Sequence, residues 1–176
     1  TADDFVFGAE WILTPANESD NVDTLANVIV NAKEYFDGTV TDFAEVGVKA
    51  LDEHTLQYTL KDTCPYFLSM MTYVAFMPAN RQFVEECGEY YGTSNDTLLY
   101  NGAYYCTSWE PQNELVMERN DNYWDAENVS IKTVYGKYNA EAEALAPEMY
   151  LRGEIDEATI PVEILDSWMN DPEKQN

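Results

Sequence analysis

The spacing of hydrophobic residues changes along this chain, and that change limits the folds open to it. Residues 2–13 and residues 25–36 repeat apolar side chains every three or four positions, which predicts two amphipathic helices. Between residues 46 and 60 the period becomes two, with a polar turn at residues 52–54, which predicts a β-hairpin. Helical and strand periods in separate blocks favour an α+β fold.

The rest of the chain adds further helices and strands. Helices are predicted in four segments, of which the first is a short continuous apolar run expected to be buried: residues 66–77, 81–91, 140–151 and 164–169. Three alternating runs predict an antiparallel meander: residues 103–109, 114–119 and 131–138. We therefore expect helices plus a β-hairpin in residues 1–80, and a strand meander with flanking helices in residues 81–176.

The chain is strongly acidic. Its 33 Asp and Glu residues against 9 Lys and Arg residues give a formal net charge of −24. Such a surface repels phosphate backbones and anionic lipids, so no nucleic-acid partner is expected and direct membrane binding is disfavoured. No stretch of the sequence approaches the ~20 apolar residues that cross a bilayer. The excess of acidic residues does not identify a binding partner, because the solubility that such a charge gives is a sufficient explanation for it.

Residues with metal or catalytic chemistry are few. The three cysteines form no CxxC pair, and His54 is the single histidine, so neither a structural zinc site nor another cofactor is expected. One disulfide, such as Cys87 with Cys106, stays open. His54 falls at the hairpin tip, where we expect it to be exposed and without a catalytic companion. The motifs of serine hydrolases, P-loop proteins and zinc proteases are absent, and we expect no enzyme.

Two other interpretations stay open from the residues alone. The many carboxylates could supply a glycoside-hydrolase pair, or the strands could form an inert adhesion module. The aromatic residues could line a ligand groove or fill the core. In a regular strand Tyr105 and Trp109 share one face and Tyr104 lies on the other, so one set at most would face a ligand.

Several short segments, in one order along the chain, resemble a known family. They are residues 1–11 (TADDFVFGAEW), 46–56 (VGVKALDEHTL), 64–67 (CPYF), 100–104 (YNGAY) followed by Trp109, 118–124 (ERNDNYW) and 153–156 (GEID). Together they resemble the oligopeptide-binding, extracytoplasmic solute-binding proteins of peptide ABC transporters, the family 5 solute-binding proteins. The resemblance covers nearly all of this chain but only about the middle third of a full-length member. We therefore expect a piece of a longer protein.

The resemblance implies a fragment of a two-lobed periplasmic-binding-protein fold. Residues 1–80 would belong to the small additional domain of peptide-binding members, and residues 81–176 to the first ligand-binding lobe. It implies a receptor without catalysis, which closes two lobes on an extended oligopeptide and delivers it to the permease subunits of an ABC transporter. The expected place is outside the cytoplasm, in the periplasm or as a cell-surface lipoprotein whose lipid anchor lies outside this fragment. Some members of the family bind nickel chelates, haem or oligosaccharides, so these solutes remain alternatives to a peptide ligand.

The resemblance also indicates candidate ligand-binding residues: Asn21, Tyr73, Asn101, Gly102, Tyr104, Glu157, Ala158 and Thr159. Asn21 falls near a tyrosine that lines a side-chain pocket in the family, and that tyrosine is absent here. The last three follow the Gly-Glu-Ile-Asp segment, near a family stretch that touches the peptide main chain, although the segment is shorter here. An Asn-Gly turn that starts a buried strand explains Asn101 and Gly102 without any ligand.

Overall fold

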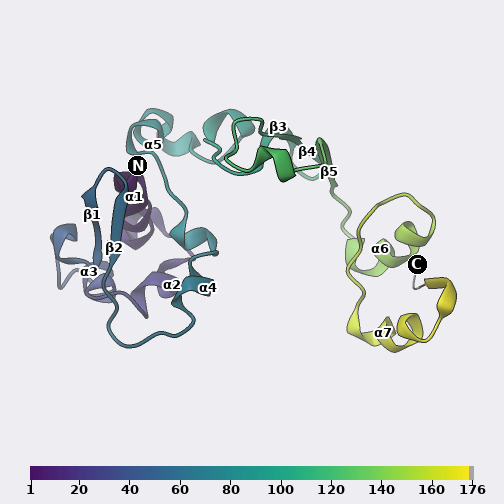
Figure 1. The fold of residues 1–176 in the computed structure, drawn as a ribbon, viewed down its shortest axis with the longest axis horizontal. Coiled ribbons are helices and arrows are strands. Elements are labelled where there is room, and N and C mark those ends of the chain that lie inside the picture. The colour runs from purple at the N-terminus through teal and green to yellow at the C-terminus, as the bar shows by residue number, and fades with distance from the viewer. Residues whose placement is uncertain (175–176) are drawn as a thin grey trace. The chain divides into compact units, whose positions relative to one another are not determined.

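The chain folds as two units, residues 1–99 and residues 100–176, which are described in turn (Figure 1). The computed structural model describes residues 1–174, without the side chains of residues 143 and 173. Each unit holds helices and an antiparallel sheet, which confirms the predicted α+β class. The assignment of residues 1–80 and 81–176 to two different domains of the family stays a prediction.

Helix α1 (Ala2–Leu13) forms the centre of unit 1, as predicted. Asp3 and Asp4 lie in its first turn, where a carboxylate favours the positive end of the helix dipole. The helix packs against the hairpin and against the chain near residue 75. Its buried face supplies Ala9, Ile12 and Leu13 to the core, which is completed by Leu25, Ala26, Ile29, Ala32, Val46, Val48, Ala75 and Phe76.

The single helix predicted over residues 25–36 is wrong, because the chain forms two short helices instead. Helix α2 (Val22–Ala26) and helix α3 (Ala32–Phe36) are separated at Ile29, which forms an antiparallel bridge with Leu60. Asn31 then adopts a left-handed conformation with φ 58°, which asparagine tolerates better than most residues. The backbone between the two helices therefore extends the hairpin sheet and does not continue a helix.

The predicted β-hairpin is confirmed. Strand β1 (Val48–Asp52) pairs antiparallel with strand β2 (Thr55–Tyr58), and His54 lies exposed in the turn, as expected. Gly47 leads into β1 at a close approach of two backbones. A Cβ atom at Gly47 would lie 2.5 Å from the carbonyl oxygen of Thr59, so only glycine fits there.

The buried helix predicted over residues 66–77 is wrong. The segment forms only helix α4 (Phe67–Met70) and the 3-10 turn η3 (Val74–Phe76), and it buries fully only Ala75 and Phe76. Leu68 is 80% exposed. Phe67, Met70 and Met71 of the segment are partly buried and pack against the core.

Three aromatic rings anchor this segment to the hairpin. The rings of Tyr58, Phe67 and Phe76 meet edge to face, with centroids 5.5 to 5.8 Å apart. Burial in this cluster raises the pKa of Tyr58 to about 12, since the charged phenolate is poorly solvated there.

Helix α5 (Arg81–Cys87) is shorter than predicted and ends at Gly88, whose φ of 54° suits glycine. The Arg81 guanidinium lies 2.6 Å from the Glu10 carboxylate of α1 and 4.2 Å from the centre of the Phe7 ring. These contacts hold α5 against α1 within unit 1.

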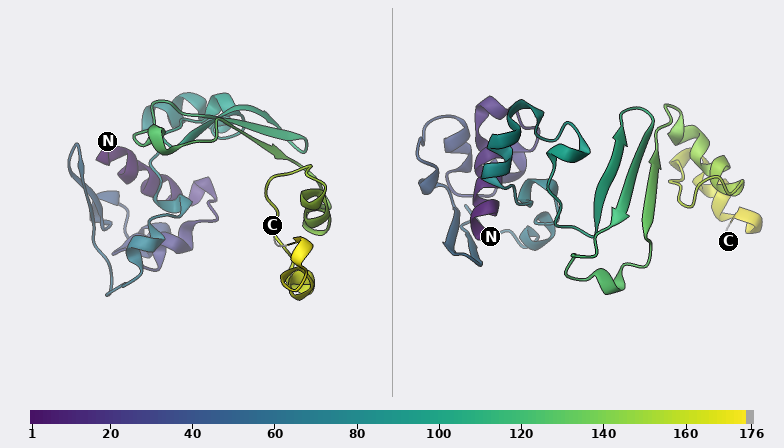
Figure 2. Two further views of the ribbon diagram at one scale, coloured as in Figure 1. Left: turned by 45° about the vertical axis from the view of Figure 1, so that its right-hand side comes forward. Right: turned by 90° about the horizontal axis from the view of Figure 1, so that it is seen from above.

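Unit 2 contains the predicted antiparallel meander. Strands β3 (Tyr104–Glu110), β4 (Glu114–Arg119) and β5 (Thr133–Lys137) pair in the order β3-β4-β5 (Figure 2). Turns of a few residues join β3 to β4, as expected for neighbouring antiparallel strands.

The predicted faces of β3 are wrong because the strand carries a β-bulge. Cys106 pairs with Met117, whereas Ser108 pairs with the next residue of β4, so β3 has one extra residue between them. An extra residue reverses the alternation beyond it. Tyr104 and Trp109 therefore share one face of the sheet, and Tyr105 lies on the other.

Two predicted helices follow the sheet: α6 (Ala142–Leu151) and α7 (Val162–Met169). Both lie where the sequence indicated. Further 3-10 turns connect the elements: η1 (Pro15–Asn17), η2 (Phe43–Glu45), η4 (Gly88–Tyr90), η5 (Asn95–Thr97), η6 (Ala126–Asn128) and η7 (Pro172–Lys174).

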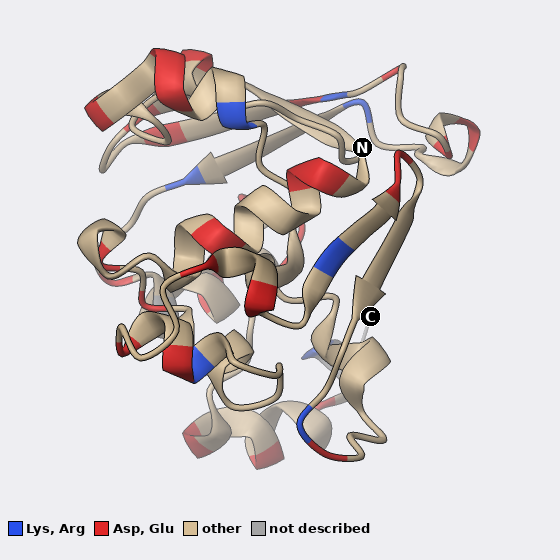
Figure 3. Ribbon diagram, turned by 90° about the vertical axis from the view of Figure 1, so that its left-hand side faces the viewer, with Lys and Arg blue, Asp and Glu red and all other residues tan. Residues whose placement is uncertain are grey.

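Acidic residues are spread over most elements, and basic residues are few (Figure 3). Among residues 1–174, no helix is long and apolar enough to cross a membrane. Cys64, Cys87 and Cys106 are all free thiols in the described chain, so the disulfide left open from the sequence is not formed.

Candidate functional site

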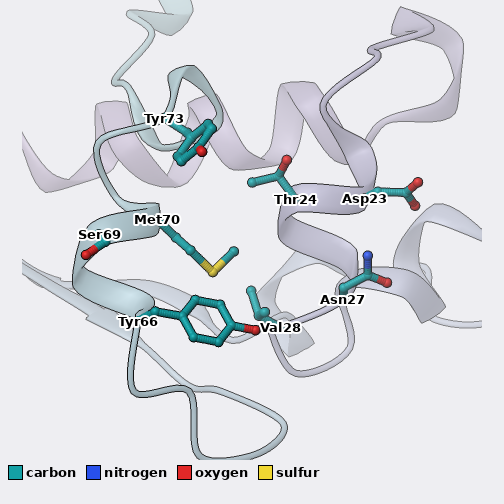
Figure 4. Close-up of a pocket in the computed structure, with 8 residues that line it drawn as sticks. All are labelled: Asp23, Thr24, Asn27, Val28, Tyr66, Ser69, Met70 and Tyr73. Carbon is teal, nitrogen blue, oxygen red and sulfur yellow. The ribbon is translucent and has the colours of Figure 1, made fainter.

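A cavity of about 550 Å³ lies in unit 1, between the chain around α2 and the chain around α4 (Figure 4). Its lining residues are Asp23, Thr24, Asn27 and Val28 on one side, and Tyr66, Ser69, Met70 and Tyr73 on the other. The Met70 side chain extends toward α2 between the two tyrosine rings, while Ser69 points away from α2 (Figure 4). The volume lies within the range of small-molecule sites, roughly 300–1,000 Å³.

The short length of α4 places both tyrosines at the cavity. Tyr66 precedes the helix and Tyr73 follows it in an extended conformation, so each ring stands at one end of the single helical turn. Tyr66 is 62% exposed and Tyr73 is 64% exposed. Two aromatic rings that contribute little to the core are therefore available to a ligand.

The polar groups of the cavity are free to bind. The side chains of Thr24, Asn27 and Ser69 and both tyrosine hydroxyls make no hydrogen bond with any residue that the structure describes. Met70 and Val28 are half-buried and provide an apolar wall. The cavity thus offers aromatic and aliphatic surface together with unused hydrogen-bonding groups.

Asp23 is the one charged residue among those that line the cavity. It lies at the outer end with its carboxylate directed away from Met70 (Figure 4). Two lysines of this region are engaged elsewhere. The Asp37 carboxylate, 2.6 Å from Lys33 Nζ, raises the pKa of Lys33, and Asp23 adds only a minor contribution. Lys61 donates to the carbonyl oxygen of Ala26 at 3.0 Å.

Of the predicted site residues in unit 1, Tyr73 lines the cavity and Asn21 does not. Asn21 immediately precedes α2, two residues before Asp23, and its backbone N–H donates to the Ser19 hydroxyl at 3.3 Å. Asn21 is half-buried and contributes to the start of the helix.

The other predicted site residues lie in unit 2. Asn101 and Gly102 are exposed just before β3, and the Asn120 amide donates to the Gly102 carbonyl at 3.0 Å. The Tyr104 hydroxyl donates to the Ile131 carbonyl at 3.1 Å. These contacts give the segment a structural role in the sheet.

Glu157, Ala158 and Thr159 lie in the extended segment between α6 and α7. Glu157 and Thr159 are exposed and Ala158 is half-buried. Whether this segment and the other candidates bind a ligand stays a prediction.

Sequence reasoning missed Asp23, Tyr66 and Met70 as cavity residues. It assigned Tyr66 and Met70 to a buried helix, because a continuous apolar run normally marks one. The available signal was the pair of tyrosines within the run, Tyr66 and Tyr73, since a large ring with a polar tip is often placed where that tip stays in contact with water.

Side chains that could bind a metal or act in catalysis are scattered in the part of the chain that the structure describes. Within the described part of the chain, no group of three or more His, Cys, Asp or Glu side chains could hold a metal ion. His54 lies 3.9 Å from the Glu53 carboxylate, and both side chains are exposed at the hairpin tip.

Known proteins are similar to this chain along its whole length. The model of the middle region of the bacterial extracellular solute-binding proteins, family 5, matches residues 1–176. The oligopeptide-binding protein AmiA of Streptococcus pneumoniae is 36% identical over 136 residues, which is 76% of this chain and 20% of AmiA. The periplasmic oligopeptide-binding protein OppA of Salmonella typhimurium is 31% identical over 168 residues, which is 93% of this chain and 30% of OppA.

Solved structures of oligopeptide-binding proteins are also similar to this chain. The substrate-binding domain of an oligopeptide ABC transporter from Bacillus anthracis superposes on this chain with a TM-score of 0.84 at 31% sequence identity. The superposition covers 98% of this chain and 33% of the Bacillus anthracis chain. Listeria monocytogenes OppA bound to peptide gives a TM-score of 0.83 at 25% identity, with 98% and 33% coverage.

These similarities define the class as a solute-binding protein built on the two-lobed periplasmic fold, of which this chain matches a fragment. The chain belongs to the bacterial extracellular solute-binding proteins, family 5. It spans about a fifth to a third of the length of the relatives it matches. The relatives are peptide-binding transport proteins, and nothing among them supports the glycoside-hydrolase interpretation.

Proposed function

We propose that this chain is part of the substrate-binding component of an ABC transporter, which captures oligopeptides outside the cytoplasm and delivers them to membrane permease subunits. The observation that carries the proposal is the match over the whole chain to oligopeptide-binding proteins, in sequence and in fold. One neighbour, OppA of Listeria monocytogenes, was solved with peptide bound.

The chain acts as half of a two-part grip in this proposal. Extended peptides are held through their main chain, with pockets for the side chains, and both sides of the peptide must be covered. The residues that would cover the opposite side lie in the two thirds of the relatives that this chain does not match. Attachment to the membrane would come from a lipid anchor outside these residues.

Calorimetry on two samples tests the proposal: the 176-residue chain, and the product of the whole reading frame that contains it. Each is titrated with a mixture of short peptides and, as a control, with the corresponding free amino acids. The whole product should bind peptides tightly, and the chain alone should not. Nanomolar binding by the chain alone would refute the two-part grip, and a whole product that ignores peptides would refute the peptide assignment.

A further inference from the structure

The cavity between α2 and α4 has a lining whose chemistry selects among ligands. Its members include two exposed tyrosine rings, the thioether of Met70, a carboxylate and neutral hydroxyl or amide groups, and it contains no lysine or arginine. An anionic ligand would find no positive partner there and would meet a chain of net charge −24. The lining therefore disfavours phosphates and carboxylates.

The same lining fits a cation in three separate ways. The faces of Tyr66 and Tyr73 attract a positive group through the ring quadrupole. The Asp23 carboxylate at the outer end adds a negative charge that forms no hydrogen bond or ion pair with any described residue. The apolar wall of Met70 and Val28 suits the methylene stem that carries an amine or a guanidine.

We propose that this cavity binds an organic cation on an aliphatic stem, an alkylammonium or alkylguanidinium group. The stem lies along Met70 and the charged head lies against the tyrosine rings, where the Asp23 carboxylate at the outer end attracts it without direct contact. The hydroxyl and amide groups of the lining accept its N–H donors. The group could be a free amine or a basic side chain of a peptide. The proposal does not depend on the peptide grip proposed above, although Tyr73 is also one of the residues predicted to bind the peptide.

The lysines nearby do not occupy this place. Lys33 is held by Asp37 at 2.6 Å, and Lys61 is shared between the Ala26 carbonyl and the Glu34 carboxylate, 3.6 Å away. Neither Lys33 nor Lys61 therefore occupies the cavity, and the place is available to the cation of a ligand.

Binding is measured on the 176-residue chain by NMR, with the methyl group of Met70 as the reporter. n-Pentylammonium chloride is the probe, and 1-pentanol and sodium pentanoate are controls with the same stem and no positive charge. Pentylammonium should shift the Met70 methyl in a saturable manner at millimolar concentration, and both controls should bind at least about fivefold more weakly. Equal binding of 1-pentanol, or no saturation by pentylammonium, would overturn the proposal.

Substitutions of Asp23 and Tyr73 test whether the carboxylate and the aromatic ring contribute to binding of the cation. Asp23→Asn and Tyr73→Leu should each weaken pentylammonium binding by roughly two- to fivefold. Asp62→Asn removes an exposed carboxylate from outside the lining and should leave the affinity unchanged. Asp23 and Tyr73 are exposed, so both variants should retain the circular dichroism spectrum of the parent chain. An Asp23→Asn effect no larger than that of Asp62→Asn would show general charge attraction and refute the site.

A second comparison identifies the source of the cation. Acetyl-Ala-Lys-Ala-amide is tested against its norleucine analogue, which keeps the stem and lacks the charge. Displacement of pentylammonium by the lysine peptide alone assigns the cavity to peptide side chains. If neither peptide displaces it, the cavity takes free amines, and the cation class still stands. Displacement by both peptides equally would refute a cation site.

Discussion

Gly47 lies where three backbone segments of unit 1 meet, and its replacement by alanine tests that junction. The Gly47 N–H donates to the Val30 carbonyl at 2.9 Å, and its carbonyl accepts from the Thr59 N–H at 2.7 Å. An added Cβ would lie 2.5 Å from the Thr59 oxygen and 3.2 Å from a methyl group of Ile29. The residue is buried between the hairpin and the segment that joins α2 to α3.

The expected cost follows from these distances. The Thr59 carbonyl must retreat by roughly 1 Å to reach ordinary contact, and it is backbone, so it cannot turn aside. Overpacking costs about 1–3 kcal/mol, and two weakened hydrogen bonds cost about 0.5–1.5 kcal/mol each. Alanine recovers about 0.4–1 kcal/mol through a less flexible unfolded chain. We expect Gly47→Ala to lower the free energy of unfolding of unit 1 by about 3 kcal/mol, near the middle of the range that these contributions span.

Urea denaturation and hydrogen exchange measure this effect. The midpoint should fall without a change in slope, and the amides of Gly47 and Thr59 should lose protection before the rest of unit 1. Gly102→Ala is the matched control, because a Cβ there meets nothing within 4 Å, and it should change stability by less than about 0.5 kcal/mol. A Gly47→Ala midpoint equal to that of the control would refute the reasoning.

Three further predictions concern other parts of the chain. Arg81→Ala removes the ion pair and the ring contact with α1, and thermal denaturation should show a loss of about 1 kcal/mol that shrinks at high salt. Because burial raises the pKa of Tyr58 to about 12, the unfolded state loses this proton first, and Tyr58 should lower stability by about 1–2 kcal/mol as pH rises from 10 to 12. Tyr58→Phe should make the fall in alkaline melts smaller by that amount, while Tyr91 and Tyr105, whose pKa values are also raised, keep part of it. Deletion of Thr107 removes the extra residue of β3 and should retain the sheet in NMR spectra, whereas deletion of Val116 from β4 should reverse the faces and unfold it.

The elements predicted correctly are those that local pattern decides. Alternation over residues 46–60 and over the three strands of unit 2 fixes which residues can pair, because a shift by one would turn the apolar side outward. Helix α1 also follows from local spacing. Each of these elements forms its own hydrogen bonds or pairs with the next strand along the chain.

The failures have a common cause, which is contact between distant residues. Ile29 has the spacing of a helix, yet its bridge to Leu60 draws the backbone into the hairpin sheet. The apolar run at residues 66–77 is indistinguishable from a core helix by its sequence, yet only Ala75 and Phe76 of the run are fully buried in the core with α1 and the hairpin. The family resemblance indicated Tyr73, whereas Asp23 and Tyr66 could not be named from the sequence, since the cavity forms only where the chain around α2 faces the chain around α4.

The bulge in β3 gives the sheet of unit 2 its two chemically different faces. Cross-strand partners share a face, so Tyr104, Trp109, Leu115 and Met117 lie together on one side, and Glu110, Glu114 and Glu118 lie together on the other. If Thr107 paired with Val116 in regular alternation, Trp109 would lie opposite Glu114 among the carboxylates, and the apolar face would lose its largest ring. The sequence conceals this arrangement because strict alternation pairs Trp109 with Tyr105. A ligand that reaches the Tyr104 side of the sheet therefore meets apolar surface with Arg119 at one end, and a ligand on the opposite side meets three glutamates beside Lys137.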